Sequence, residues 1–485
     1  MSKASLEVLS RDEIELIHGT SLRILSDVGF KVESPAVVEM LRNAGARVRD
    51  DGVTVHIDER LVSEALRTVP RSIRICSRSG RDHTIPNEDV QLMSTDGQPA
   101  AIFDVETGSR RPSTLKDATD LAVLADALSE VDFIWPPVVA TDMPPAKSSY
   151  YEFLVSIANS GKHIQHAAAS EDEARFQIEV ASAIMGSRDE LRERPIISDV
   201  CTPISPLRYD KGEVEGMVLL ARHGIPIVQL SMGIAGTVTP ASVAGTLAVV
   251  NAENLFGLTL TQVAAPGAPS IYSSFSGVAD LRSGVFLCGT PEAVLMDVGA
   301  IQMAKSYGLP SCAGGPANAA RSLSVEAGYQ TAMTAMASLL AGADLMVGLG
   351  GLDRSGMISY EKLVMDCELW RWLKRLRSGI GVDGASLGFD AVRRQGPGGT
   401  FLSDPHTLMY MRRDIMIPQV TSYHAPGDPD RGRDELLEHA RKRVKEILST
   451  HKPPLLEREV ATMVGAIAKR YGIVHNDGSQ VFRHR

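Results

Sequence analysis

The stretch that decides the fold runs from residue 195 to residue 231 and reads PIISDVCTPISPLRYDKGEVEGMVLLARHGIPIVQLS. It begins and ends with short apolar runs rich in β-branched residues, PIISDVC (195–201) and IPIVQLS (225–231). Between them, KGEVEGMVLLARHG has apolar residues at helical spacing and ends at a glycine. Two nearly continuous apolar strands joined by a helix predict a parallel sheet covered by helices.

The same alternation continues on both sides of this unit and gives eight apolar runs in all. Helical patterns such as DEARFQIEVASAIMG and PEAVLMDVGAIQMAKSYG separate the runs. Eight such units over about 270 residues match a (β/α)8 barrel, the TIM-barrel fold of the α/β class. The rival interpretation is a doubly wound open sheet. The expected strands are VQLMST (90–95), DFIWPPVVA (132–140), KHIQHAAA (162–169), PIISDVC (195–201), IPIVQLS (225–231), PSIYSSF (269–275), PSCAG (310–314) and ADLMVGLG (343–350).

The segments before and after the barrel are expected to add helices to it. Residues 1–89 form an N-terminal helical and extended region, whose first helix has Ser10 as its N-cap, Glu13 three residues on, and its end at Gly29. The barrel then occupies residues 90–359. Residues 360–485 form a C-terminal helical layer packed on the barrel, and we expect a homo-oligomer, which this layer can help to build.

Composition excludes several classes of function. A net charge of -9 over 485 residues, with no basic stripe, argues against nucleic-acid binding. The N-terminus has no signal-peptide pattern, and the uncharged stretch 224–252 is interrupted by Pro226 and Pro240, so we expect neither export nor a membrane span. The five cysteines form no CxxC pair, which argues against disulfides or a zinc knuckle and favours the cytoplasm.

Residues at the carboxyl ends of the eight runs are candidates for the active site, since barrel enzymes build it there. Aromatic, small and uncharged residues dominate this set, which does not fit a phosphate or sugar site. Trp135, Tyr272 and Phe275 fit a cage for a methylated cation, because aromatic faces attract quaternary ammonium groups; a role in the core is the alternative. The set is Asp96, Trp135, His166, Cys201, Thr202, Ser231, Met232, Tyr272, Phe275, Gly314, Gly315, Gly350 and Gly351.

Other kinds of chemistry find less support in the sequence. His163 and His166 lie three apart on a strand and point to opposite faces, so they cannot chelate one metal ion, and no metal site is expected. No lysine falls at a strand end, which argues against Schiff-base catalysis and an aldolase. Gly314, Gly315 and Asn318, which precede a helix, can offer backbone N–H groups to a carboxylate, although a plain turn explains them equally well.

Three longer stretches carry a resemblance to a known family: MGIAGTVTPASVAGTLAVVNAENL (232–255), PSCAGGPANAARSLSVEAGYQ (310–330) and ADLMVGLGGLDRSGMISYEKLVMDCEL (343–369). With these, the sequence resembles the trimethylamine methyltransferase superfamily over nearly its whole length, and within it the non-pyrrolysine branch that includes glycine betaine methyltransferases. The resemblance implies a barrel, a methylated amine as substrate, and methyl transfer to cob(I)alamin held by a separate corrinoid protein.

The resemblance also narrows the expected substrate. The trimethylamine enzymes carry a pyrrolysine in the region that corresponds to the stretch after Gly315, where this chain has only standard residues. The expected donor is therefore a quaternary amine, glycine betaine first, bound by Trp135, Tyr272, Phe275, His166, Gly314, Gly315 and Asn318. No DxHxxG corrinoid motif occurs, so a partner must supply the cob(I)alamin and no cofactor is tightly bound. Trimethylamine, carnitine or proline betaine as donor, and a non-catalytic betaine-binding barrel, are the alternatives.

Overall fold

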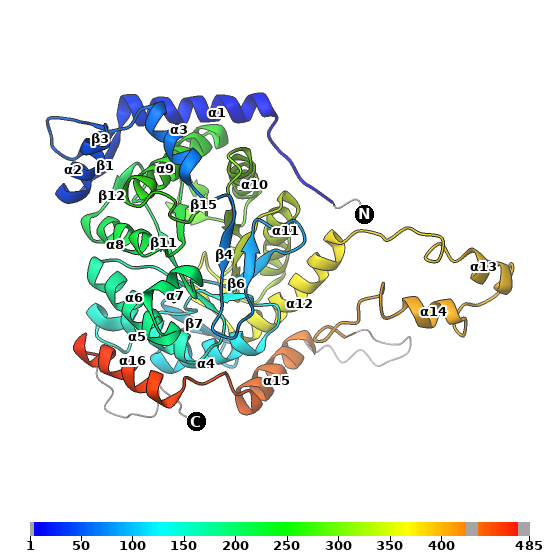
Figure 1. Cartoon of the computed structure of the whole chain (residues 1–485). Coiled ribbons are helices and arrows are strands. Elements are labelled where there is room, and N and C mark those ends of the chain that lie inside the picture. Colours follow the sequence, from blue (N-terminus) through cyan, green and yellow to red (C-terminus); the bar gives the residue numbers. More distant parts are fainter. Residues whose placement is uncertain (1–3, 423–434, 474–485) are drawn as a thin grey trace.

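The computed structural model describes residues 4–422 and 435–473. At its centre eight parallel strands close into a barrel in the order β10-β11-β13-β15-β18-β19-β6-β9 (Figure 1). Each strand lies inside one of the eight predicted runs, so the TIM-barrel prediction is confirmed and the open sheet is excluded. The strands are β6 (Leu92–Thr95), β9 (Phe133–Ile134), β10 (His163–His166), β11 (Ile197–Cys201), β13 (Ile227–Ser231), β15 (Ser270–Ser274), β18 (Ser311–Gly314) and β19 (Leu345–Leu349).

Helices form the outer layer, one main helix after each strand. Most begin at a Ser, Thr or Asp whose side chain accepts a backbone N–H of the first turn, as Asp210 and Ser324 do. Two end at a left-handed glycine, Gly186 and Gly342. The main helices are α4 (Leu115–Ala127), α5 (Ser148–Ala158), α6 (Glu171–Met185), α8 (Lys211–Arg222), α9 (Val243–Ala264), α10 (Pro291–Ser306), α11 (Val325–Ala341) and α12 (Tyr360–Arg377), with α7 (Arg188–Glu193) and the short η2 (Pro145–Lys147) in connections.

The uncharged stretch 224–252, which raised the question of a membrane span, is divided between β13, a loop and the first ten residues of helix α9. By length and composition helix α9 could cross a membrane, but 83% of its most apolar window is buried inside the protein. It packs against α1 (Arg11–Arg23), α3 (Glu59–Thr68), α8 and α10. Its apolar character is therefore accounted for by its place between the barrel and the N-terminal helices.

Side chains alternate between the inside of the barrel and the helical layer. Val200, Val228 and Ile271 belong to one interior cluster. The hairpin β4 (Ile73–Ile75) and β5 (His83–Ile85) adds its isoleucines to the same cluster and so closes the amino-terminal end of the barrel. The opposite end, where the strands have their carboxyl termini, is called the mouth below.

The N-terminal region packs on α9 and α10. Helix α1 (Arg11–Arg23) begins with the predicted capping box of Ser10 and Glu13 and continues through a π-helical turn to Gly29. A sheet in the order β12-β1-β3-β2 follows, in which Phe30 stacks on Phe256 of α9 at 4.0 Å between ring centroids. The elements are η1 (Ile24–Val28), β1 (Phe30–Val32), α2 (Pro35–Asn43), β2 (Arg47–Val48), β3 (Thr54–His56), α3 (Glu59–Thr68) and β12 (Arg208–Tyr209).

Two small sheets that the sequence did not predict stand in the loops at the mouth. One has the order β20-β21-β7-β8, and the other β14-β16-β17. Their strands have two to four residues, too short to show a periodicity. They are β7 (Ala101–Asp104), β8 (Ser109–Pro112), β14 (Ile234–Ala235), β16 (Gly277–Asp280), β17 (Val285–Leu287), β20 (Gly351–Leu352) and β21 (Met357–Ile358).

The C-terminal region has two parts that behave differently. Helix α15 (Glu435–Thr450) packs on α12 and α4, and α16 (Arg458–Arg470) packs on α6, as a layer on the barrel. Residues 378–422, with α13 (Phe389–Gln395) and α14 (Pro405–Tyr410), instead project away from the barrel as a long arm (Figure 1). The layer that we expected across the whole region is therefore interrupted by this arm.

Candidate active site

A small cavity of about 210 Å³ opens at the mouth of the barrel, where the carboxyl ends of its strands meet. Pockets for drug-sized ligands span ~300–1,000 Å³, so this one suits a smaller molecule. Its lining includes Trp135, Phe275, Asp96 and Arg354 near the loops and Gln165, Ser273 and Cys312 on the strands. The candidate site is built from these residues.

Trp135 stands directly after β9 and is held from the neighbouring strand β6. Its backbone N–H donates to Ser94 Oγ at 3.0 Å, and its carbonyl accepts a hydrogen bond from Thr95 Oγ1 at 2.6 Å. The indole ring lies against Gly97, where any Cβ would collide with ring atoms. A glycine at this place is thus required for the ring to face the cavity.

Phe275 follows β15 and forms a second aromatic part of the wall. Its N–H donates to the carbonyl of Ser231 at 3.1 Å, and its ring meets Phe286 of β17 edge to face at 6.0 Å. Gly314 stands behind the ring, at a position where a Cβ would again be too close. Two glycines therefore make room for two aromatic rings that border one cavity.

Asp96 follows β6 and is fully buried in the same wall. Its carboxylate accepts hydrogen bonds from Ser355 Oγ at 2.9 Å and from the N–H of Gly97 at 3.0 Å. Burial raises the pKa of Asp96 to about 6, since desolvation outweighs these hydrogen bonds. The group is mostly ionised at neutral pH, and a bound cation would stabilise that form further.

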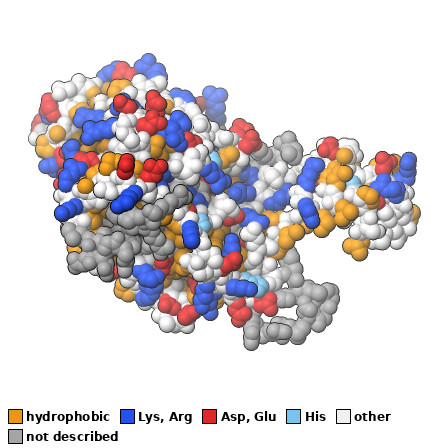
Figure 2. Space-filling model, turned by 60° about the horizontal axis from the view of Figure 1, so that its bottom comes forward, with side chains coloured by type: hydrophobic (Ala, Val, Ile, Leu, Met, Phe, Trp, Pro, Cys, Tyr) orange, Lys and Arg blue, Asp and Glu red, His pale blue; other side chains and the backbone are white. Residues whose placement is uncertain are grey.

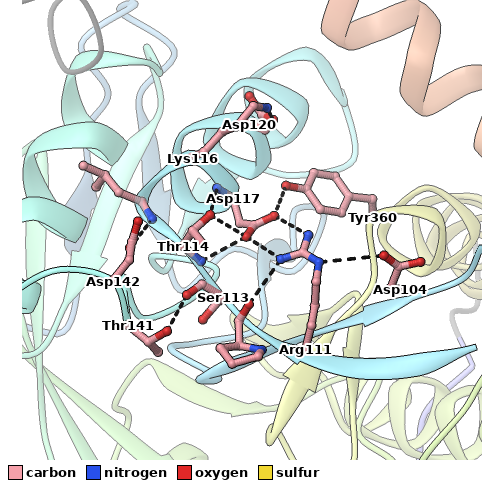
Figure 3. Close-up of polar contacts among 12 residues, drawn as sticks. Asp104, Arg111, Ser113, Thr114, Lys116, Asp117, Asp120, Thr141, Asp142 and Tyr360 are labelled. Atoms are coloured by element: carbon pink, nitrogen blue, oxygen red, sulfur yellow. Dashed lines mark hydrogen bonds and ion pairs between the residues drawn. The ribbon is translucent and has the colours of Figure 1, made fainter. Parts of the chain in front are cut away.

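The sheet β20-β21-β7-β8 carries a further wall over the cavity and is anchored to the barrel helices. Arg111 at the end of this sheet donates two hydrogen bonds, of 2.8 and 2.7 Å, to the Asp117 carboxylate at the start of α4 (Figure 3). Tyr360, the first residue of α12, donates to the same carboxylate at 2.9 Å. Burial alone would raise the pKa of Asp117, but hydrogen bonds from Arg111, Thr114 and Tyr360 lower it below its ordinary value.

The turn between β20 and β21 places Arg354 at the cavity. Asp353, Arg354 and Ser355 all have left-handed backbone conformations, with φ of 50°, 61° and 62°. Three consecutive non-glycine residues in this region are costly and occur where a site needs them. The N–H of Asp353 donates to the Ala320 carbonyl at 2.8 Å, and that of Arg354 to the Asn318 carbonyl at 2.9 Å, which holds the turn in place.

Positive charge exceeds negative charge around this turn. The Asp353 carboxylate pairs with Arg354 and also lies 3.7 Å from Arg110 and 3.8 Å from Arg321. Three guanidinium groups thus share one carboxylate. The wall that carries Arg354 can attract an anion, and it stands beside Asp96, which can attract a cation.

The floor of the cavity is polar but offers no activated nucleophile. Both amide atoms of Gln165 and the hydroxyl of Ser273 are buried without a hydrogen-bond partner among the described residues. Such unpaired atoms are costly in an empty core and are explained by a ligand or water that pairs with them. Burial raises the pKa of the Cys312 thiol to about 12, so Cys312 is a neutral thiol.

Two residues predicted for the site lie outside the cavity. Tyr272 points from β15 into the helical layer, where its hydroxyl donates to Asn251 of α9 at 3.2 Å. His166 points outward from β10, with its Nδ1 2.7 Å from the Ala167 carbonyl and its ring edge to face with Phe153. Strand alternation explains the position of Tyr272, because Tyr272 and Phe275 are three residues apart and cannot share a face.

The three residues predicted at the end of β18 and in the loop after it have different positions. Gly314 and Asn318 line the cavity. Gly315 packs against Met93, and its N–H donates to the Val347 carbonyl at 2.7 Å, so this N–H is not available to an anion. Asn318 donates its side-chain amide to the Gly351 carbonyl at 2.8 Å, while its Oδ1 is buried without a partner among the described residues.

Arg354 is the main residue that the sequence reasoning missed. It lies beyond Gly350 and Gly351 at the eighth strand end, in a hairpin whose strands are too short to predict. The signal available was the charged pair Asp353–Arg354 inside the glycine-rich stretch GLGGLDRSG (348–356). Asp96 was noted at a strand end but not given a role. Within residues 4–422 and 435–473, no group of three or more His, Cys, Asp or Glu side chains could hold a metal ion.

The fold and the cavity define a (β/α)8-barrel protein with a small cavity at the mouth. The family model for trimethylamine methyltransferase matches residues 2–472. A glycine betaine methyltransferase of Desulfitobacterium hafniense (strain Y51) is 31% identical over 467 residues, which cover 96% of this chain and 97% of that protein. The trimethylamine methyltransferase MttB of Methanosarcina barkeri is 28% identical over 485 residues, covering 97% and 96%.

A solved structure agrees on the fold. The monomethylamine methyltransferase of Methanosarcina barkeri matches with a TM-score of 0.53 over 96% of this chain and 88% of that chain, at 11% sequence identity. The family model over residues 2–472 and the relative at 31% identity show that the chain belongs to the trimethylamine methyltransferase family, and that it is an enzyme of the methyltransferase class. The resemblance inferred from the sequence is confirmed.

Proposed function

We propose that this enzyme takes a methyl group from a quaternary amine, glycine betaine, and passes it to cob(I)alamin on a separate corrinoid protein. The observation that carries the proposal is the cavity at the barrel mouth, which sets the fully buried Asp96 beside the aromatic rings of Trp135 and Phe275. Anionic and aromatic groups together form a site for a cation that cannot donate hydrogen bonds.

The ammonium end of the substrate binds to this aromatic and acidic wall. Each aromatic face contributes ~0.5–2 kcal/mol to holding a quaternary ammonium, and ionised Asp96 balances its charge inside the barrel. None of these groups needs to remove a proton. The departing amine keeps the electron pair of the broken N–C bond, so the site must position the methyl group and exclude water, and it needs no general base.

The carboxylate end of glycine betaine binds to Arg354. A guanidinium can donate two parallel hydrogen bonds to a carboxylate, which fixes the direction of the substrate as well as its charge. The excess of arginine around Asp353 leaves Arg354 free to take this second partner. Choline and trimethylamine lack a carboxylate and would lose this contact.

The corrinoid supplies a strong nucleophile for the methyl group when it is present. A cavity of about 210 Å³ accommodates a small amine but not a corrin ring. The corrinoid must then reach the mouth from outside, carried by another protein, which agrees with the missing DxHxxG motif. We place this reaction in the cytoplasm, where a reduced corrinoid can persist, and the five cysteines of this chain are unpaired.

The proposal is tested by mixing the purified enzyme with chemically reduced cob(I)alamin and one amine at a time, and following methylcobalamin by its absorbance. We expect methylcobalamin and dimethylglycine in equal amounts from glycine betaine. Product from trimethylamine, carnitine or proline betaine in preference to glycine betaine would reassign the donor. No product from any amine would overturn the proposal.

A matched pair of variants shows whether the cavity is responsible. Asp96→Asn should abolish most of the activity, while Tyr272→Phe, at a tyrosine outside the cavity, should leave it unchanged. Calorimetry tests the alternative, a non-catalytic betaine-binding barrel. Tight binding of glycine betaine by a protein that forms no methylcobalamin would identify that alternative.

A further inference from the structure

The arm of residues 378–422 exposes an unusual amount of apolar surface. Twelve of the twenty-three exposed large apolar side chains of the described residues lie on it. The most exposed are Leu402 at 85%, Ile380, Val382, Phe389, Leu387 and Leu408. In Figure 2, orange apolar side chains line the arm where it leaves the body of the molecule. Isolated exposed apolar residues are ordinary, but a concentration of this kind marks a contact surface.

Next to the arm, helices α11 and α12 turn apolar stripes to solvent. Val325, Tyr329 and Met336 are exposed along α11 at helical spacing, and Trp372 and Leu376 along α12. We call these five residues the α11–α12 face. Apolar residues at this spacing ordinarily face the core of a protein. Their exposure indicates that something covers this face in the working protein.

A cavity deepens the α11–α12 face. Its volume is about 590 Å³, and Val325, Met365, Leu369 and Trp372 belong to its lining, together with Leu436 of α15. Thr421, the end of the arm, lies at its edge. A mostly apolar hollow therefore opens beside the place where the arm rejoins the barrel, on the same surface that the arm leaves exposed.

We propose that two copies of this chain form a two-fold dimer in which the arm of each copy packs on the α11–α12 face of the other. A two-fold contact brings the same surface of both subunits together, so an arm and its receiving face must be neighbours on one chain. The arm and the α11–α12 face are neighbours on this chain, since Thr421 of the arm lines the same cavity as Val325 and Trp372. The contact would cover seventeen of the twenty-three exposed large apolar side chains.

Charge and area both fit a second copy. Residues 378–422 contain four Asp and four Arg, so the arm is neutral, and the charge of -9 on a second copy of the chain does not repel it. The seventeen side chains are each at least 37% exposed. At roughly 50 Å² or more apiece, they reach the ~800 Å² per partner of a standard stable interface.

The position of the arm argues against the corrinoid protein as its partner. The arm begins after Arg377, which bonds to Gln91 just before β6, at the amino-terminal end of the barrel. The methyl carrier must instead approach the mouth at the other end. A carrier must also leave after each transfer, whereas large apolar contacts are typical of permanent assemblies.

Analytical ultracentrifugation of the full-length enzyme tests the proposal. We expect a dimer at micromolar concentration. Leu402→Glu on the arm and Tyr329→Glu on the receiving face should each raise the dimer dissociation constant about 100-fold or more, because each puts two unpaired charges into one interface. Leu16→Glu is the matched control and should remain dimeric, because Leu16 of α1 is 72% exposed, between Tyr329 at 60% and Leu402 at 85%.

Cross-linking gives a second, independent measurement. All five native cysteines are buried, so an introduced cysteine is the reactive one. A mixture of Leu402→Cys and Tyr329→Cys chains should cross-link between chains with a bismaleimide, while Leu402→Cys mixed with Leu16→Cys should not. A monomeric enzyme, an odd number of subunits, or arm and face variants that stay as dimeric as the wild type would overturn the proposal.

Discussion

The mouth of the barrel and the C-terminal arm both present apolar surface, but they hold it in opposite ways. At the mouth, Trp135 and Phe275 are half-buried, each fixed by neighbouring strands and by a glycine that makes room for its ring. On the arm, Phe389 of α13 and Leu402, in the turn between α13 and α14, are mostly exposed outside the barrel. A rigid wall suits a small ligand that must be aimed, and an extended apolar arm suits a large partner.

This difference predicts that the two regions can be damaged separately. Substitutions at the mouth should change methyl transfer and leave assembly intact, and substitutions on the arm should do the reverse.

The largest effect is expected at Asp96. Asp96→Asn removes the charge that balances the ammonium inside the barrel, and losing one partner of a buried charge pair costs ~2–5 kcal/mol, a fall in kcat/KM of about 30-fold to several thousand-fold. Steady-state kinetics of methyl transfer measure this fall in kcat/KM. Sedimentation should be unchanged, and a variant that keeps near wild-type kcat/KM would remove Asp96 from the site.

Arg354 is expected to show a smaller and more selective effect. Arg354→Met removes the carboxylate partner, so kcat/KM for glycine betaine should fall ~10-fold to 100-fold, the range of hydrogen bonds to charged groups. Arg354→Lys should lose less of the kcat/KM for glycine betaine than Arg354→Met does. Activity with any amine that has no carboxylate should be unaffected; an equal loss for all amines would show that Arg354 acts on the fold and not on the substrate.

Trp135 should contribute less than either charged residue. Trp135→Leu keeps an apolar side chain but loses the aromatic face, so affinity for glycine betaine should fall about 3-fold to 30-fold, as ~0.5–2 kcal/mol per cation–π contact implies. Titration calorimetry measures it. Trp135→Phe should bind glycine betaine more tightly than Trp135→Leu does. Unchanged affinity in Trp135→Leu would mean that the ammonium binds elsewhere.

The pH dependence should follow Asp96. Its pKa is raised to about 6 by burial, so it is ionised above that value and becomes neutral as the pH falls through it. Affinity for glycine betaine should therefore drop below about pH 6 and stay level above it. Asp96→Asn should flatten this profile, and a wild-type profile without an acid limb would contradict the assignment.

The smallest effect on methyl transfer is expected for a substitution on the arm. Leu402→Glu should weaken the dimer and yet leave kcat/KM per subunit within about twofold of the wild type, because the arm begins at the end of the barrel opposite the mouth and surface substitutions seldom perturb a distant site. A large loss of activity in this variant would show that the two regions are coupled through assembly.

Much of the barrel could be predicted from the sequence because its strands are buried on both sides. PIISDVC and IPIVQLS read as apolar runs, and each contains one strand of the closed barrel. The mouth was harder to predict, since β20 and β21 have two residues each and are defined by pairing with a distant hairpin. Arg354 was missed for this reason.

A run that correctly predicts a strand does not by itself show which side of the sheet each side chain faces. Tyr272 and Phe275 both come near the end of one run, but alternation sends one to α9 and the other to the cavity. The same rule had already separated His163 from His166. The arm could not be foreseen, because DPHTLMYMRRDI has a helical pattern whether it packs on its own barrel or on another chain.

The most direct test of the account is a crystal structure of the enzyme with glycine betaine. We predict the ammonium against the Trp135 ring and the Asp96 carboxylate, within ~6 Å of the ring centroid, with the carboxylate of the ligand on Arg354 and one methyl group turned toward the mouth. Glycine betaine bound outside this cavity, or with its carboxylate turned away from Arg354 toward the barrel floor, would contradict it.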